Sequence, residues 1–407
     1  MTVFEDLKWR GLIQDISSPE LEKKLNEGGM TFYIGTDPTA DSLHLGHYSS
    51  FLITRRLAKA GHTPIILVGG ATGLIGDPRG TNERELAHRE TIQHNFEKLK
   101  EQVQKIFPYE VVNNYDWVKD LTVIDFLRDY GKFINVSYMI NKDLVKRQME
   151  TGISYAEFSY MLLQGLDFKH LHETRGVDLQ VAGSDQWGNI TTGIELTRKT
   201  IGDEVFGFTM PLVTDSRGNK FGKSEGNAVW IDKEKTSSYE LYQFLLNSED
   251  DMIIEYLKRL TFLTKEQIEE IEKQHNEAPH LRIAQKTLAR EIITDLHGSE
   301  EYENAVKTSE SLFKGNIKDI AVKDLLVGLK GVPSFEITSG NIVDILVDNK
   351  VCSSKREARE FISSGAISIN GDSVKDETLT IDKSIALEEK LIVIRKGKKN
   401  YFIANVK

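Results

Sequence analysis

Two short motifs carry the residues that are best suited to chemistry on a nucleotide. The first reads His-Leu-Gly-His and places His44, Gly46 and His47 where a loop leads into a helix. Histidines three residues apart lie on one helical face, the helix N-terminus offers free N–H groups, and a glycine leaves room for a flat ligand. A pair of surface histidines, or an incidental metal pair, would be the more frequent explanation if this tetrapeptide stood alone.

The second motif is a basic loop far downstream. Residues 220–224 read Lys-Phe-Gly-Lys-Ser, follow a predicted sheet strand and lie between Gly218 and Gly226. From such a loop the ammonium groups of Lys220 and Lys223 can reach phosphates. An exposed basic loop is the commoner origin of this pentapeptide by itself. The presence of both motifs on one interrupted α/β sheet, however, favours a nucleotide site over two separate explanations.

Alternating strands and helices position the two motifs. Apolar runs predict strands at 32–34, 64–68, 109–113, 177–181 and 208–213, and helices are expected at 43–60, 83–106 and 187–200. Continuous apolar runs are typical of parallel strands that are covered on both faces. The alternation of strands and helices therefore predicts an α/β fold with a doubly wound parallel sheet.

The remaining segments predict additional domains. Residues from about 115 to 170 read mostly as helices and interrupt the sheet as a helical insertion. Residues from 236 to about 313 are helical again, and the stretch 314–340 lacks strong periodicity and reads as a linker. The last segment predicts two short helices and a tight hairpin. The expected domains are an α/β domain at 1–235, an all-α domain at 236–325 and a small α+β domain at 341–407.

Composition excludes several classes of protein. Of the 407 residues, 39% are hydrophobic and 28% are charged, which excludes a disordered or fibrous chain. No apolar run approaches the roughly 20 residues of a membrane span, and acidic residues stand where a secretory signal needs a basic flank. We therefore expect a cytoplasmic protein. Cys352 is the only cysteine, which excludes an intramolecular disulfide and a cysteine-built zinc site.

Charge is unevenly distributed along the chain. The formal net charge is −10, which argues against a surface coated with positive charge for indiscriminate binding of nucleic acid. Residues 342–407, in contrast, hold 12 Lys and Arg against 10 Asp and Glu. This slightly basic tail is compatible with a local anionic partner, and equally with an ordinary scatter of surface charge.

Together, the two motifs resemble the HIGH and KMSKS signatures of class I aminoacyl-tRNA synthetases. The surrounding sequence resembles the bacterial tyrosyl-tRNA synthetases over nearly the whole chain, including 33–39, 70–78, 160–164 and 183–189. The tail resembles an RNA-binding module shared with a ribosomal protein, the helical domain an anticodon-binding domain, and the insertion the family's dimer contact. The resemblance thus implies a Rossmann-like core, tRNA(Tyr), L-tyrosine and ATP as partners, and a homodimer.

The resemblance also implies roles for individual residues. For the amino acid these are Tyr33 and Asp167 at the phenolic hydroxyl, Asp77, Tyr160 and Gln164 at the ammonium group, and Gln186 at the carboxylate. For ATP they are Asp37, Gly46, Ser50, Gly183, Asp185, Lys223 and Ser224. The spacing agrees, because Tyr160, Gln164 and Asp167 fall on one face of a helix. By itself, Asp37 would equally be an ordinary turn aspartate before proline.

The reaction implied by the resemblance has two steps. L-Tyrosine and ATP form tyrosyl-adenylate and pyrophosphate, and the tyrosyl group then passes to the terminal adenosine of tRNA. The attacking carboxylate is already ionised, so catalysis must come from alignment and from cations and donors near the leaving pyrophosphate. The residues expected to act there are Thr39, His44, His47, Lys220 and Lys223, with magnesium on the ATP phosphates and no metal held by the protein.

Two positions depart from the family pattern. Residues 79–84 read Arg-Gly-Thr-Asn-Glu-Arg where family members often carry lysines, so Arg84 is the residue expected to replace them at phosphate. Ser50 stands three residues after His47, where we expect a threonine or a similar group near the ribose. Neither departure removes a residue on which the reaction depends.

Two other functions compete with this interpretation. A class I enzyme for tryptophan shares the fold and both motifs, although Asp167 beside Tyr33 favours a phenol over an indole. A non-catalytic RNA-binding protein on a synthetase scaffold would use the tail and the helical domain to bind structured RNA. The two intact motifs argue against this second alternative, because a protein without the activity has no need of them.

Overall fold

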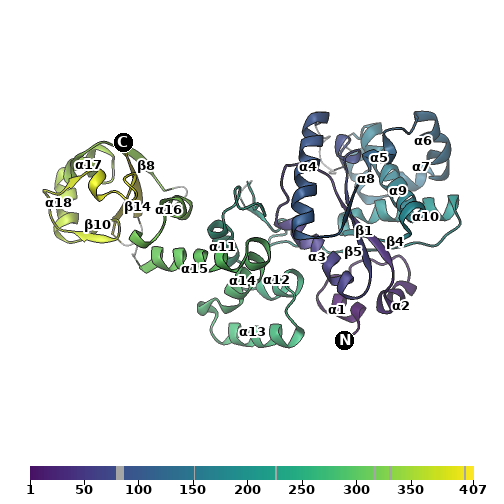
Figure 1. Cartoon of the computed structure of the whole chain (residues 1–407), viewed down its shortest axis with the longest axis horizontal. Coiled ribbons are helices and arrows are strands. Elements are labelled where there is room, and N and C mark those ends of the chain that lie inside the picture. The colour runs from purple at the N-terminus through teal and green to yellow at the C-terminus, as the bar shows by residue number, and fades with distance from the viewer. Residues whose placement is uncertain (79–86, 151, 225–226, 315–316, 330–331, 398–399) are drawn as a thin grey trace. The chain divides into compact units, whose positions relative to one another are not determined.

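The computed structural model describes residues 1–78, 87–150, 152–224, 227–314, 317–329, 332–397 and 400–407 (Figure 1). Contacts divide the chain into two units. The first comprises residues 1–235 and 248–284, and the second comprises residues 236–247 and 285–407. Among the helices of the described residues, none is long and apolar enough to cross a membrane.

The first unit is built on a sheet of five strands. These are β1 (Thr31–Thr36), β2 (Thr63–Val68), β3 (Glu110–Asn113), β4 (Val177–Gly183) and β5 (Phe206–Met210). They lie in the order β3-β2-β1-β4-β5, and every neighbouring pair is parallel. The order reverses between β1 and β4, and open α/β sheets bind their ligands at such a point, outside the carboxyl ends of the strands. The predicted α/β class and its doubly wound sheet are confirmed.

Four helices pack on this sheet. They are α3 (Leu45–Lys59), α4 (Arg89–Ile106), α9 (Tyr155–Arg175) and α10 (Trp187–Thr200). Helix α3 connects β1 to β2 and α4 connects β2 to β3, so both lead toward the β3 edge of the sheet. Helix α10 connects β4 to β5 and leads toward the opposite edge. Because such connections are right-handed, α3 and α4 cover one face and α10 covers the other. The apolar run of β1 is therefore buried, with Phe32 and Tyr33 at most 1% exposed.

The insertion between β3 and β4 is helical, as predicted. Its short helices are α5 (Tyr115–Val118), α6 (Val123–Asp129), α7 (Val136–Ile140) and α8 (Asp143–Met149). They share an apolar core with α9 and α10 that includes Ile134, Met139, Val145, Met161, Leu162 and Leu196. Helix α9 begins at the Ser154 cap and ends at Gly176, whose φ of 62° turns the chain into β4. This long helix thus joins the insertion to the sheet.

Helix α12 (Ile253–Leu260) also belongs to the first unit, and two buried arginines hold its carboxyl end. Arg10, which follows α1 (Val3–Trp9), donates to the carbonyl oxygens of Lys258 at 2.9 Å and Leu263 at 2.8 Å. Arg56 of α3 donates to the carbonyl oxygen of Thr261 at 2.5 Å. Carbonyl groups at a helix C-terminus lack partners within the helix and carry partial negative charge, so the guanidinium groups stabilise this end.

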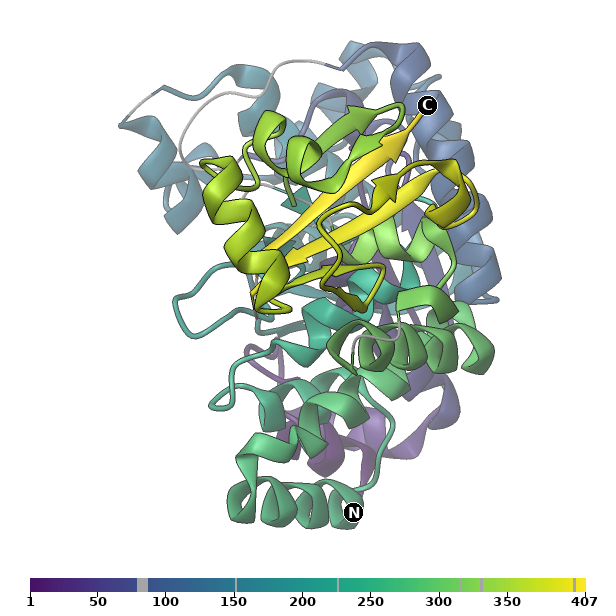
Figure 2. The same cartoon turned by 90° about the vertical axis from the view of Figure 1, so that its left-hand side faces the viewer.

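The second unit combines helices with a mixed sheet. Its helices are α11 (Ser238–Leu246), α14 (Ile283–His297), which begins at the boundary, α15 (Ser299–Lys314), α16 (Val322–Gly328), α17 (Ile342–Asp348) and α18 (Lys355–Ser363). Its sheet has the order β11-β10-β13-β14-β8 and contains β8 (Ser334–Ile337), β10 (Ile367–Ile369), β11 (Asp372–Val374), β13 (Leu391–Lys396) and β14 (Asn400–Val406). The predicted pair of helices and tight hairpin are α17, α18 and β10–β11. The longer hairpin of β13 and β14, yellow in Figure 2, has no counterpart in the predicted elements.

The prediction of an irregular linker at 314–340 is wrong for much of this segment. Helix α16 lies within it, and Leu325 and Leu329 pack against Val393 and Ile403 of the tail sheet. Strand β8 pairs in parallel with β14, with Phe335 opposite Ala404. A strand of four residues whose partner is the last strand of the chain leaves little periodicity in its own sequence, so the local pattern reads as irregular.

Candidate active site

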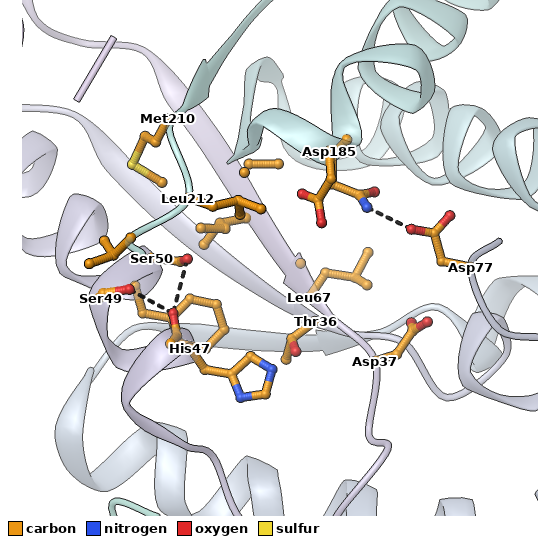
Figure 3. Close-up of a pocket in the computed structure, with 18 of the residues that line it drawn as sticks. Thr36, Asp37, His47, Ser49, Ser50, Leu67, Asp77, Asp185, Met210 and Leu212 are labelled. Carbon is orange, nitrogen blue, oxygen red and sulfur yellow. Dashed lines mark hydrogen bonds between the residues drawn. The ribbon is translucent and has the colours of Figure 1, made fainter. Parts of the chain in front are cut away.

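A cavity of about 320 Å³ lies at the carboxyl ends of β1, β2, β4 and β5 (Figure 3). The predicted site residues that line it are Tyr33, Asp37, Thr39, His44, Gly46, His47, Ser50, Asp77, Tyr160, Gln164, Asp167, Gly183, Asp185, Gln186 and Lys220. The fold therefore brings together residues from widely separated segments. The side chains of Lys223 and Ser224 lie outside the described part of the chain, and so does Arg84.

Backbone hydrogen bonds join the histidine motif to residues 229–231, and the N–H of Val229 in turn donates to the carbonyl of Gly222 in the basic loop at 2.7 Å. The N–H of Leu45 donates to the carbonyl of Val229 at 2.9 Å, and the N–H of Ile231 donates to the carbonyl of Leu43 at 3.0 Å. Gly222, between the two lysines, has a φ of 80°, and a Cβ atom there would lie 2.8 Å from the Leu45 Cβ. Glycine is therefore required at this position both for the backbone conformation and for the close contact with the histidine motif.

The two histidines are fixed at the start of α3. The Nδ1 atom of His44 accepts from the Gly46 N–H at 3.0 Å, and the Nδ1 atom of His47 accepts from the His44 N–H at 3.3 Å. Their rings stack with centroids 3.8 Å apart. Because Nδ1 is the acceptor in both rings, each neutral imidazole carries its proton on Nε2, from which it can donate to an anion.

Lys220 and Asp185 form a long, exposed ion pair in the same cavity. The Lys220 Nζ lies 3.7 Å from the Asp185 Oδ2, and the two side chains are 57% and 43% exposed. An ion pair of this kind contributes little free energy, so a ligand can separate it easily. The hydroxyl of Ser50 donates to the Gly46 carbonyl at 3.2 Å, so this serine presents its oxygen near the start of α3 (Figure 3).

Asp167 is a buried carboxyl group with two donors. It accepts hydrogen bonds from the Asn114 Nδ2 at 3.0 Å and the Trp117 Nε1 at 2.8 Å. Burial raises the pKa of Asp167 to about 7, although these two hydrogen bonds oppose the shift. The neighbouring hydroxyl of Tyr33 is buried and has no hydrogen-bond partner among the described residues. Burial, and then the charge of Asp167, raise the pKa of Tyr33 well above its usual value.

Asp37 connects the ring of Tyr160 to the same network. The Tyr160 hydroxyl donates to the Asp37 Oδ2 at 2.9 Å, and the Thr72 hydroxyl donates to the Asp37 Oδ1 at 2.7 Å. The Asn114 Nδ2 donates to the Thr72 hydroxyl at 3.0 Å as well as to Asp167. A continuous chain of hydrogen bonds therefore runs from Tyr160 to Asp167, and it holds two carboxyl groups in place.

Asp77 is the third carboxyl group of the cavity and is partly buried. It accepts from the Gln186 Nε2 at 2.7 Å (Figure 3), and the Asn189 Nδ2 contacts Asp77 at 3.4 Å and Gln164 Oε1 at 3.0 Å. Burial raises the pKa of Asp77 to about 7, the hydrogen bond from Gln186 opposes this, and the charge of Asp37 adds to it. The amides thus arrange three predicted tyrosine contacts, Asp77, Gln164 and Gln186, around one point.

The sequence analysis does not identify four of the side chains that hold these carboxyl groups, namely Thr72, Asn114, Trp117 and Asn189. Thr72 and Asn189 lie within segments that carry the family resemblance. Asn114 directly follows β3, and a polar residue at the carboxyl end of a predicted strand is a signal that could have found it. Trp117 offers no such signal, because a tryptophan in a helical insertion reads as part of a core.

The cavity contains two chemically distinct groups of side chains. One comprises Asp37, Asp77 and Asp167, and the other comprises His44, His47 and Lys220. The first group suits an ammonium ion and a hydroxyl donor, and the second suits phosphate oxygens. Within the described residues, no cluster of three or more His, Cys, Asp or Glu side chains could hold a metal ion.

Known proteins resemble this chain in both sequence and structure. The profile described as tRNA synthetases class I (W and Y) matches residues 25–314, and that described as tyrosine–tRNA ligase SYY-like C-terminal domain matches residues 324–404. The chain is 50% identical to a tyrosine–tRNA ligase of Streptococcus agalactiae serotype Ia, with 100% of each chain covered. It is 64% identical to tyrosine–tRNA ligase 2 of Streptococcus thermophilus over 73% of this chain and 98% of that relative. A C-terminally truncated mitochondrial tyrosyl-tRNA synthetase of Aspergillus nidulans has a TM-score of 0.69 at 32% identity and covers 76% of this chain and 94% of that chain.

The raised pKa of Asp167 predicts a pH-dependent stability of the protein without ligands. Its usual value of 3.8 applies to the unfolded chain and the value of about 7 to the folded one, so the folded state binds the additional proton between these limits. The contribution of Asp167 to stability is therefore complete below pH 3.8 and declines as the pH rises to 7. The substitution Asp167→Asn removes this decline. The free energy of unfolding of the variant, relative to that of the parent, should therefore rise by roughly 2 to 3 kcal/mol from pH 5 to pH 8.

Denaturant unfolding of both proteins at several pH values measures this difference. Glu20→Gln on the exposed start of α2 (Glu20–Glu27) removes one carboxylate without burial and serves as the control. A difference between Asp167→Asn and the parent that stays constant with pH would show that Asp167 titrates normally in the folded protein.

Proposed function

This chain belongs to the class I tRNA synthetases for tryptophan and tyrosine, and we propose that the cavity is the site where it activates L-tyrosine with ATP. As a tyrosine–tRNA ligase, it forms tyrosyl-adenylate and pyrophosphate and then transfers tyrosine to the 3′ end of tRNA(Tyr). The observation that carries the assignment of the site is the buried hydroxyl of Tyr33 beside the carboxyl group of Asp167. The reaction takes place in the cytoplasm, where tRNA, ATP and the ribosome meet.

The phenolic hydroxyl of tyrosine fits between Tyr33 and Asp167. A phenol can accept a hydrogen bond from Tyr33 and donate one to Asp167, so both buried groups obtain a partner. An indole N–H can only donate, and a phenylalanine ring can do neither, so both would leave a buried polar group unsatisfied. Asn114 and Trp117 keep the carboxyl group of Asp167 oriented in the empty cavity, which prepares it for the hydroxyl.

The ammonium group of tyrosine fits among Asp77, Tyr160 and Gln164. A cation beside Asp77 lowers its pKa again, so the bound amino acid stabilises the carboxylate form. Gln164 and Gln186 already lie next to Asp77 through the amide of Asn189. Because one Gln186 N–H is donated to Asp77, the other N–H is the donor for the tyrosine carboxylate. This carboxylate is thereby directed toward the α-phosphorus of ATP.

ATP occupies the part of the cavity near the start of α3. Gly46 leaves room for the base, and the Nε2 atoms of His44 and His47 donate to phosphate oxygens together with Thr39 and Lys220. The further contacts that we propose are Asp37, Ser50, Gly183 and Asp185 on the nucleoside side and Lys223 and Ser224 on the phosphate side. Magnesium enters with the ATP phosphates as part of the substrate, and no resident metal is required.

These donors act on the leaving group. Negative charge moves onto pyrophosphate as the bond to the α-phosphorus breaks, and the two histidines and the lysines of the basic loop are placed to stabilise it. The attacking tyrosine carboxylate is ionised at neutral pH and requires no general base. The rate enhancement therefore derives from the alignment of two substrates and from fixed positive charge and N–H donors.

Recognition of tRNA falls to the residues that follow the catalytic core. We assign anticodon binding to 236–325, of which 248–284 belong to the first unit, and general RNA binding to 341–407. In the tail, α18 carries the cations Lys355, Arg356 and Arg359 on its exposed surface. Lys355 pairs with Asp344 at 2.6 Å and Arg359 lies 3.4 Å from Glu377, so acidic neighbours partly compensate these two charges. Arg356 is the residue of the three that we expect to contact a phosphate most directly.

The insertion supplies the contact of a homodimer. Large apolar side chains that are at least 45% exposed gather there, namely Val123, Ile124, Leu127, Val136, Met149 and Tyr155. Single exposed apolar residues are normal, but a group of them within one segment marks an interaction surface. A second copy of this chain, which presents the same surface about a two-fold axis, would cover the group.

The phenol pocket predicts how the enzyme chooses between tyrosine and phenylalanine. Asp167→Ala should lose most activity with tyrosine, because a charge-assisted hydrogen bond worth about 1.5 to 3 kcal/mol disappears and Asn114 and Trp117 lose their acceptor. Tyr33→Phe removes one neutral hydroxyl and should cost about 0.5 to 1.5 kcal/mol, with a relaxed preference for tyrosine. Pyrophosphate exchange with each amino acid measures both effects, and Tyr109→Phe is the control for loss of a tyrosine hydroxyl elsewhere. If both variants keep the parent's preference for tyrosine, the phenol is bound at another place.

The tail predicts a local and salt-dependent contribution to tRNA binding. Arg356→Ala should weaken tRNA binding and reduce the slope of log K against log salt by about 1, while tyrosine-dependent pyrophosphate exchange stays at the parent level. Filter binding at several salt concentrations measures the slope. Lys23→Ala on α2 removes an equal charge from another exposed helix and should leave the slope unchanged. Equal slopes for Arg356→Ala and the parent would exclude a phosphate contact at this residue.

The exposed apolar side chains of the insertion predict which substitution prevents formation of the dimer. Ile124→Asp would place an unpaired carboxylate in the proposed contact, so we expect the variant to be monomeric at micromolar concentration, whereas the parent is dimeric. Sedimentation velocity distinguishes the two states. Leu326→Asp on α16, where the leucine is 44% exposed, introduces the same charge outside the insertion and should leave the dimer intact. A dimeric Ile124→Asp protein would argue against this surface.

A further inference from the structure

Helix α12 connects the basic loop to the histidine helix, and we propose that Tyr256 on α12 is a positioning residue for the formation of tyrosyl-adenylate. Tyr256 is 2% exposed and does not belong to the residues that line the cavity. It therefore acts through the loop that carries Lys220. This inference rests on the proposed function of the cavity and adds a residue to it that neither sequence motif contains.

Tyr256 holds both flanks of the segment that carries Lys220. Its hydroxyl donates to the carbonyl of Thr214 at 2.9 Å, and Thr214 forms an antiparallel bridge with Lys220. Its ring packs on the ring of Phe221, the next residue along the chain, with centroids 4.6 Å apart. One buried side chain thus contacts the residue opposite Lys220 and the residue beside it, so its position determines where the backbone of Lys220 lies.

The segment that Tyr256 holds is itself a closed hairpin. The N–H of Phe221 donates to the carbonyl of Val213, and the N–H of Asp215 donates to the carbonyl of Asn219, both at 2.8 Å. The carboxylate of Asp215 also accepts from the N–H groups of Arg217 and Asn219. These bonds make 213–221 a single structural element. A displacement at Thr214 is therefore transmitted to Lys220 rather than absorbed between them.

Glu249, just before α12, provides a second attachment for the hairpin. Its two carboxylate oxygens accept from the N–H and the hydroxyl of Ser216, each at 2.9 Å. Unlike Tyr256, Glu249 is only partly buried. Both attachments come from the same short stretch of chain, so the hairpin follows α12.

The opposite end of α12 is attached to the helix that begins at the histidine motif. Arg56 of α3 donates to the carbonyl oxygens of Arg259 at 3.2 Å and Thr261 at 2.5 Å, and Arg10 donates to Lys258 and Leu263. Helix α12 therefore fixes the distance between α3 and the Lys220 hairpin. The tyrosine contacts at Asp167 are held by Asn114 and Trp117 instead, so a change in α12 should leave tyrosine binding intact.

Two substitutions at Tyr256 and one at Glu249 test this role in the full chain. Tyr256→Phe loses only the hydrogen bond to Thr214, and Tyr256→Leu loses the ring contact as well. We expect kcat for tyrosine-dependent pyrophosphate exchange to fall by about 3-fold in Tyr256→Phe and by about 10-fold or more in Tyr256→Leu. In both variants KM for ATP should rise and Kd for tyrosine should stay unchanged. Glu249→Ala loosens the same hairpin from a less buried position and should show the same pattern, even if Tyr256→Leu folds poorly.

Leu257→Val removes a buried methylene group from the same helix and is the control for general loss of stability. It should lower the midpoint of unfolding without a change in kcat or in KM for ATP, once rates are normalised to the folded fraction. The positioning role is overturned if Tyr256→Phe and Glu249→Ala keep the parent's kcat and KM for ATP, or if kcat and tyrosine affinity fall together. A parent protein without tyrosine-dependent exchange would instead contradict the proposed function itself.

Discussion

Three carboxyl groups lie at the carboxyl edge of a parallel sheet, that of Asp167 buried and those of Asp37 and Asp77 partly buried, and the acidic half of the site depends on this constraint. Charge in such a place is costly unless hydrogen-bond donors or a cation compensate it. The chain supplies donors from different elements: Thr72 after β2, Asn114 and Trp117 after β3, Tyr160 on α9, and Gln186 and Asn189 near the start of α10. The helical insertion is thus part of the active site and more than an addition to the sheet.

The same constraint underlies the tyrosine pocket that we propose. The pKa values of Asp77 and Asp167 are both raised to about 7 by burial, so neither group is fully ionised at neutral pH without a ligand. An ammonium group beside Asp77 favours its charged form, and a phenol beside Asp167 adds a further donor to those of Asn114 and Trp117. An amino acid that carries both groups therefore gains more binding energy than one that carries the ammonium group alone. This coupling, more than the shape of the cavity, explains why a tyrosine–tRNA ligase needs such buried acids.

The phosphate half of the site is assembled by a different principle. Backbone pairing joins 43–45 to 229–231, Val229 bonds to Gly222 of the basic loop, and the glycine at 222 allows this loop to contact Leu45. Helix α12 then adds side-chain contacts on the hairpin that carries Lys220 and on α3. The hairpin that carries Lys220 is thus held on both flanks of this lysine by a helix that also contacts α3. The two halves meet at the point where the strand order reverses between β1 and β4.

The sequence by itself determined the α/β class and the strands of the parallel sheet, and its family resemblance pointed to many of the residues that line the cavity. Strong apolar runs identify buried parallel strands. The two motifs predict a nucleotide site only in combination, because each of them alone is more often an ordinary surface feature. Only the tertiary structure decided which groups meet. The hydrogen bond from Tyr160 to Asp37, the donors from Asn114 and Trp117 to Asp167, and the strand β8 inside the expected linker all join residues that are distant in the chain. No local pattern encodes such a pairing, because a polar side chain or a short strand is buried only when a partner from elsewhere in the fold satisfies its hydrogen bonds.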